Sequence, residues 1–101
     1  MKIYRLKHKP TGLYYQPVRG RFSKDKTNLS KNGKIYQNNQ NALIGQSDTI
    51  IINVSERQYI SNKNLFDSLG IYDSSHNYYG RYHNPKYLLR CNKSDFEKEY
   101  I

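Results

Sequence analysis

The chain has 101 residues and a formal net charge of +9, a size that suits one domain, 1–101, and leaves little room for a second. Cys91 is the only cysteine, which excludes an intramolecular disulfide and a cage of thiolate ligands and fits a reducing cytosol. No apolar run is long enough to cross a membrane and the N-terminus lacks the apolar core of a signal peptide, so we expect a cytoplasmic protein with no membrane partner.

The first part of the chain predicts a β-hairpin. Side chains alternate between apolar and basic over 2–8, as in a strand with one buried face. Pro10 and Gly12 favour a chain reversal over 9–12, because proline fixes its own φ and glycine tolerates the positive φ that many turns need. Residues 13–18 then form the returning strand, so the hairpin should have an apolar face and a basic face.

The middle of the chain predicts a loop, a strand and a helix. Residues 19–32 are polar and show no periodicity, which is typical of a loop. The run 49–54 contains four β-branched apolar residues and predicts a central, buried strand. A short helix should begin at Ser61 or Asn62, which can cap it, and end at Leu69.

Three further strands are predicted at 35–37, 85–91 and 96–101. The last of these also fits a helix, because Ser94 and Glu97 have the spacing of a capping box, but its alternating pattern favours a strand. The expected fold is therefore α+β: a small antiparallel β-sheet with an N-terminal hairpin and one short helix.

Positive charge is concentrated in the first third of the chain. Residues 1–34 contain ten basic side chains and one acid and carry a net charge of +9, whereas the other 67 residues hold seven basic and seven acidic groups. Segregated charge produces a one-sided field that attracts polyanions. We therefore expect the hairpin and the loop after it to bind nucleic acid, with RNA as the expected ligand; the alternative is a solvated, lysine-rich loop. The predicted binding residues are Arg5, Lys7, Lys9, Arg19, Arg21, Phe22, Lys24, Lys26, Lys31 and Lys34.

Phe22 lies inside this basic loop, between Arg21 and Ser23. Arginine grips phosphate with a planar fork and stacks on bases, and an aromatic ring beside it offers a stacking platform for an unpaired base. A second interpretation is that Phe22 inserts into the core and anchors the loop. The sequence leaves both interpretations open.

The sequence shows no catalytic or metal-binding pattern. The histidines, His8, His76 and His83, do not fall at zinc-ligand spacing with Cys91, and no glycine-rich phosphate loop is present. The acidic residues are mostly scattered and predict no Mg²⁺ cluster. We therefore expect no metal, no cofactor and no enzymatic activity; a small metal-free ribonuclease using His76 or His83 is the catalytic alternative.

Two segments resemble a family of short phage-encoded proteins: 4–17, with the letters KHKPTGLYY, and 27–36, with the letters NLSKNGKIY. In size and charge the chain is also similar to TifA-type phage proteins, which inhibit the RNA-cleaving toxin ToxN. The resemblance implies a phage protein in the host cytoplasm that counteracts a host defence system through an RNA-bound complex with a toxin or nuclease. The alternative to this account is direct docking on an acidic host protein without nucleic acid. The sequence leaves open whether the chain also forms a homodimer.

Overall fold

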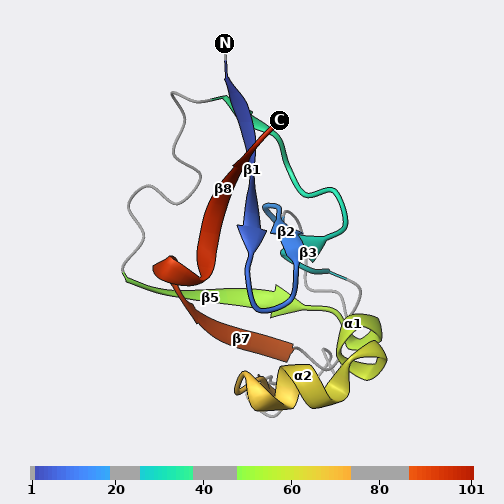
Figure 1. Ribbon diagram of the computed structural model, residues 1–101. Coiled ribbons are helices and arrows are strands. Elements are labelled where there is room, and N and C mark those ends of the chain that lie inside the picture. Colours follow the sequence, from blue (N-terminus) through green and yellow to red (C-terminus); the bar gives the residue numbers. More distant parts are fainter. Residues whose placement is uncertain (1, 19–25, 38–47, 74–86) are drawn as a thin grey trace.

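The computed structural model describes residues 2–18, 26–37, 48–73 and 87–101, which form two antiparallel sheets and two short helices (Figure 1). The first sheet is built around β1, whose two ends pair with β2 and β4 and whose length pairs with β8. β3 extends this sheet by pairing with β2. Its strands are β1 (Ile3–His8), β2 (Leu13–Tyr15), β3 (Leu29–Ser30), β4 (Tyr36–Gln37) and β8 (Phe96–Tyr100).

The second sheet has the strand order β5 (Thr49–Val54), β7 (Tyr87–Asn92) and β6 (Tyr72–Asp73). Its strands run across those of the first sheet, and the helices lie at the end away from both chain termini (Figure 1). A single 3-10 turn, η2 (Lys93–Asp95), carries the chain from β7 in the second sheet to β8 in the first.

The predicted hairpin and the predicted C-terminal strand are confirmed. β1 and β2 pair in antiparallel fashion through the turn that precedes Leu13, where Gly12 adopts a positive φ of 74°. β8 pairs with β1 from Tyr4↔Tyr100 to His8↔Phe96. The capping box near the tail is formed by Asn92 and Asp95 around η2, which leaves the following residues free to form a strand.

The predicted helix is confirmed as α2 (Lys63–Ser68), which follows Asn62 and has Leu69 at its C-terminal cap, and a second short helix, α1 (Glu56–Ser61), precedes it. α1 was not predicted, although Ser55 and Gln58 form a capping box that is readable in the sequence. Helical content is low, so the described part is a sheet-rich domain that matches the expected α+β class only loosely. None of the described helices has the length and apolar character needed to span a membrane.

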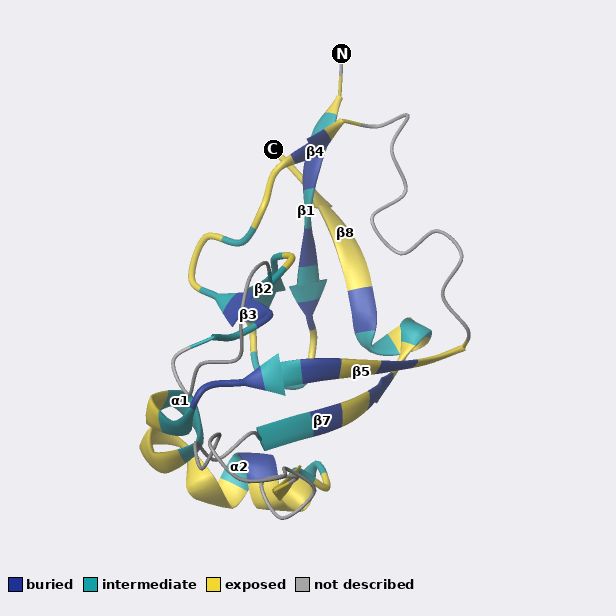
Figure 2. Cartoon of the chain, turned by 180° about the vertical axis from the view of Figure 1, so that it is seen from behind, coloured by how far each residue is buried: buried dark blue, intermediate teal, exposed yellow. Residues whose placement is uncertain are grey.

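The core lies between the two sheets (Figure 2). β5 alternates along its length, with Ile50 and Ile52 buried and Ile51 about half exposed, at 52%. The prediction of a central strand is therefore wrong: among the described strands β5 is at the edge of its sheet, and its buried side chains lie on one face. The buried apolar side chains are Tyr4, Leu6, Leu29, Tyr36, Ile50, Ile52, Val54, Phe66, Leu89, Cys91 and Phe96.

Asn28 is buried and joins the two sheets. Its Nδ2 donates to the carbonyl of Gln16 just after β2 (2.8 Å), and its Oδ1 accepts the backbone N–H of Asn53 in β5 (2.8 Å). The Asn28 backbone bonds the same two residues, donating to the Asn53 carbonyl and accepting from the Gln16 N–H. Part of the expected loop 19–32 is thus an ordered connection between the sheets.

Gly33 closes the turn that returns the chain to β4. It has a φ of 63°, and a Cβ atom placed on it would lie 2.5 Å from the Cβ of Tyr14. Both the positive φ and the close approach require glycine at this position. Asn28 and Gly33 belong to the segment 27–36, so two residues of that motif have structural roles.

Candidate nucleic-acid interface

Six of the ten predicted binding residues fall within the described part of the chain. Arg5 and Lys7 are on β1, and the lysines at the turns and connections are Lys9, Lys26, Lys31 and Lys34. Arg19, Arg21, Phe22 and Lys24 lie outside the described residues, as do His76 and His83. The two interpretations of Phe22 therefore both remain hypotheses.

The outward face of the hairpin carries acidic as well as basic groups. Arg5 pairs across the sheet with Glu99, and Lys7 with Glu97. The Lys7 ammonium is 3.9 Å from Glu99, and the Tyr14 hydroxyl donates to the same carboxylate at 2.7 Å. This face is locally balanced in charge, because β8 contributes acids that are far away in the sequence.

Positive charge and aromatic rings gather instead on the opposite face of the first sheet, at its end near the termini. We call this group the tyrosine–lysine cluster; its members are Lys2, Tyr4, Lys34, Tyr36, Lys98 and Tyr100. Strand pairing produces it, because Tyr36 and Tyr100 both lie opposite Tyr4 in register and Lys98 lies opposite Leu6. The Tyr4 ring stacks on Tyr36, with centroids 5.7 Å apart, and is tilted against Tyr100 at 5.9 Å.

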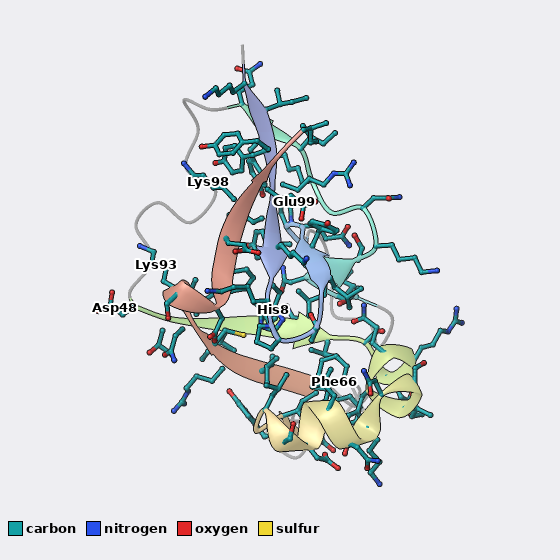
Figure 3. The ribbon with its side chains drawn as sticks, viewed as in Figure 1. His8, Asp48, Phe66, Lys93, Lys98 and Glu99 are labelled. Carbon is teal, nitrogen blue, oxygen red and sulfur yellow. The ribbon has the colours of Figure 1, made fainter. Side chains whose placement is uncertain are left out.

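Each lysine of the cluster lies over a tyrosine ring. The ammonium of Lys98 is 4.8 Å from the Tyr4 centroid, that of Lys34 is 5.3 Å from Tyr36, and that of Lys2 is 5.8 Å from Tyr100. Such cation–π contacts orient a lysine without neutralising its charge. Figure 3 shows Lys98 and Glu99 projecting from β8 on different sides, as the alternation of a strand requires.

The three lysines of the cluster are exposed, and none has a carboxylate within ion-pairing distance among the described residues. Tyr4 and Tyr36 are buried beneath these lysines, whereas Tyr100 is about half exposed, with 51% of its surface accessible to solvent. The cluster therefore offers three cationic heads around one accessible aromatic ring. Lys34 was among the predicted binding residues; Lys2, Lys98 and Tyr100 were not, because only the β1–β8 pairing brings them together.

Tyr36 should make the fold sensitive to alkaline pH. Burial, helped by the neighbouring Tyr15 and Tyr4, raises the pKa of Tyr36 from 10.0 to about 12. Between pH 10 and pH 12 the unfolded chain loses the phenol proton and the folded chain keeps it. The contribution of Tyr36 to the free energy of unfolding is therefore fully present below pH 10 and falls as the pH rises towards 12. The loss is at most about 3 kcal/mol, from about 1.4 kcal/mol per pKa unit.

Tyr36→Phe should remove this contribution. Urea unfolding at pH 9 and at pH 11.5 gives the unfolding free energy of wild type and variant. Between these two pH values the variant should lose less stability than wild type. A difference that stays constant between the two pH values would contradict the assignment.

Three side chains with metal-ligating atoms also meet in the described part: His8, Cys91 and Asp95. Burial lowers the pKa of His8, and the negative charge of Asp95 partly opposes this shift. Burial raises the pKa of the Cys91 thiol to about 12, and the charge of Asp95 adds to this shift. Cys91 is therefore a protonated thiol at neutral pH rather than an activated nucleophile. His8 is only 1% exposed and cannot reach an RNA substrate as a general base.

No protein-family model matches the chain, and neither the curated proteins nor the solved structures contain a significant match to it.

Proposed function

We propose that this protein binds single-stranded RNA through the tyrosine–lysine cluster together with the basic segment 19–25. The observation that carries the proposal is the set of exposed lysines around the accessible ring of Tyr100, which have no acidic partner among the residues that the structure describes. Phosphates would contact the ammonium groups of Lys2, Lys34 and Lys98, and an unpaired base would stack on Tyr100. Cationic side chains beside a stacking ring are how single strands are held without sequence preference.

The charge of the whole chain supports the same proposal. The described residues contain 12 basic and 7 acidic side chains, a net charge of +5, and the other residues contain 5 basic and 1 acidic, a net charge of +4. Because the outward face of the hairpin is balanced by Glu97 and Glu99, the excess must lie elsewhere. A polyanion would be drawn towards the cluster and the basic segment 19–25 rather than to the hairpin face.

On the resemblance to TifA-type phage proteins, we further propose that the bound RNA brings an RNA-cleaving host toxin such as ToxN into an inhibited complex. In this account the toxin joins through RNA. Ribonuclease treatment should then release the toxin from the immobilised protein. Retention of the toxin after complete digestion of the RNA would instead favour direct docking on an acidic host protein.

Tyr100→Ala tests the stacking contact. It should lower the affinity for a single-stranded RNA oligomer by about 5–150-fold, since stacking of one base is worth about 1–3 kcal/mol. Tyr100→Phe retains the ring and should bind like wild type. Tyr72→Ala on β6 removes another exposed tyrosine and serves as the matched control. Equal losses in the Tyr100 and Tyr72 alanine variants, measured by fluorescence anisotropy on folded protein, would rule out a specific stacking role for Tyr100.

A further inference from the structure

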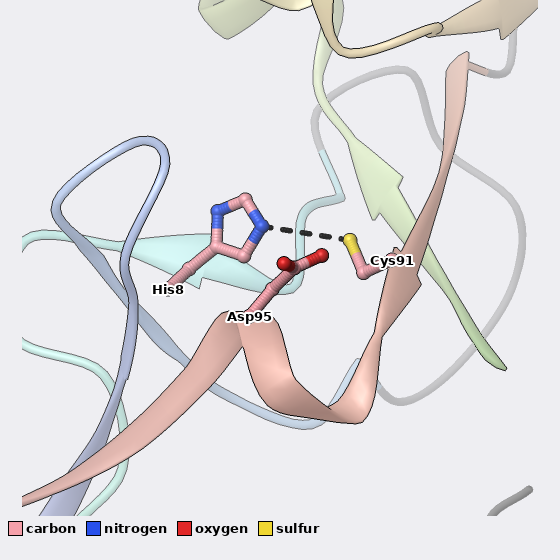
Figure 4. A group of neighbouring side chains, drawn as sticks. All are labelled: His8, Cys91 and Asp95. Atoms are coloured by element: carbon pink, nitrogen blue, oxygen red, sulfur yellow. Dashed lines mark hydrogen bonds between the residues drawn. The ribbon is translucent and has the colours of Figure 1, made fainter. Parts of the chain in front are cut away.

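His8, Cys91 and Asp95 come together where the two sheets meet. His8 is the last residue of β1, Cys91 lies on β7, and Asp95 ends the η2 turn between β7 and β8. Figure 4 shows their side chains pointing toward one another. One imidazole nitrogen, one sulfur and one carboxylate oxygen all lie within 4.8 Å of each other.

The separation of the sulfur and the nitrogen is that of two ligands of a tetrahedral metal centre. With Zn–S near 2.3 Å and Zn–N near 2.05 Å, the tetrahedral angle separates sulfur and nitrogen by about 3.5 Å. In the structure the Nε2 of His8 is 3.5 Å from the Sγ of Cys91. A hydrogen bond between a thiol and an imidazole has a similar length. Such a bond involves only two groups, whereas here the carboxylate of Asp95 lies close to both of them.

The surroundings hold His8 and Asp95 in place. The Nδ1 of His8 bonds the hydroxyl of Thr11 at 2.8 Å, which leaves Nε2 directed at the cluster. Metal-bound histidines are usually oriented in this way by an oxygen on the other ring nitrogen. The Oδ2 of Asp95 accepts the backbone N–H of Asn92 at 2.9 Å, and the Asp95 carbonyl accepts the N–H of Lys9 at 2.8 Å. The loops that carry the ligands are therefore tied to each other without a metal.

We propose that His8, Cys91 and Asp95 bind one Zn²⁺ ion, with water as the fourth ligand. A mixed sulfur, nitrogen and oxygen set suits a borderline-soft divalent ion and excludes Mg²⁺ and Ca²⁺, which take oxygen ligands. Binding replaces the thiol proton of Cys91 with a sulfur–zinc bond and releases that proton to solvent. Asp95 is half-buried, whereas His8 and Cys91 are buried, so water and the ion would enter on its side.

The role of this site follows from its position. The three ligands belong to both sheets and to the turn between them, so the ion would fasten the sheets together. An ion that binds only the folded chain raises stability by mass action. At a Zn²⁺ concentration 100 times its Kd, the melting temperature of a chain of this size should rise by roughly 10–20 °C.

The full chain, freed of metal with a chelator, allows two independent measurements. First, ZnCl₂ should raise the melting temperature of wild type and MgCl₂ should not. Asp95→Asn, which preserves shape, and Cys91→Ser should each lose most of this rise. Glu97→Gln removes a carboxylate two residues along the chain that points to the other face of β8, and should keep it. An equal rise in wild type and Asp95→Asn would overturn the proposal.

Second, Co²⁺ in place of Zn²⁺ reports on the sulfur directly. Cys91 is the only cysteine in the chain, so a sulfur-to-cobalt charge-transfer band can arise from no other residue. We expect this band in wild type and in Glu97→Gln. Its absence in the cobalt-loaded wild type would overturn the proposal even if Cys91→Ser did not fold.

Discussion

Replacing Asn28 with alanine should lower the free energy of unfolding by about 3 kcal/mol. The change removes the donor to the Gln16 carbonyl and the acceptor of the Asn53 N–H, which link the two sheets. A buried backbone group left without a partner costs about 1–3 kcal/mol, and here there are two such groups. The melting temperature should fall by about 12–24 °C, at 4–8 °C per kcal/mol for a domain of this size.

Asn64→Ala is the matched control for Asn28→Ala. Asn64 is exposed on α2, and alanine is the better helix former, so this variant should be as stable as wild type or slightly more stable. Thermal and urea unfolding of both variants measure the contrast. Two small and equal effects would mean that Asn28 does not join the sheets in solution.

Replacing Lys2, Lys34 and Lys98 together with glutamine should lower single-stranded RNA affinity by about a hundredfold at 0.1 M salt. Each phosphate neutralised on a single strand contributes about 0.7 to the slope of log K against log salt, so three lysines contribute about 2. The slope itself should become less steep by the same amount, while the fold remains intact because all three side chains are exposed.

A charge-matched variant separates this local effect from a loss of net charge. Arg57, Lys63 and Arg90 are exposed on α1, α2 and β7, away from the cluster. Their replacement with glutamine also removes three positive charges and should leave affinity and slope near wild type. Equal losses in the two triple variants would show that overall charge, rather than the tyrosine–lysine cluster, attracts RNA.

Local patterns in the sequence predicted most of the described strands. Alternation and turn chemistry act between near neighbours, so the hairpin, the β-branched run of β5 and the C-terminal strand could be recognised. Whether a strand is central or at an edge depends on which other strands pair with it. The exposure of Ile51 on β5 could therefore not be predicted from its hydrophobicity.

The candidate sites depend on pairing between distant segments. The segregation of charge along the chain was visible, but only the β1–β8 register places Glu97 and Glu99 beside the basic side chains of β1 and assembles the tyrosine–lysine cluster on the other face. In the same way, His8 and Cys91 are 83 residues apart, and no spacing rule for zinc ligands would join them. The start of α1 could have been predicted, because Ser55 and Gln58, which form its capping box, are only three residues apart.

The salt dependence of RNA binding by the unmodified protein tests the central claim most directly. Affinity for a single-stranded RNA oligomer, measured by fluorescence anisotropy from low to physiological salt, should fall steeply. The slope of log K against log salt should be about −2 or steeper, because the three lysines of the cluster alone account for about 2. Binding that is independent of salt, or no binding at low salt, would contradict the proposal that this protein binds RNA through its phosphates.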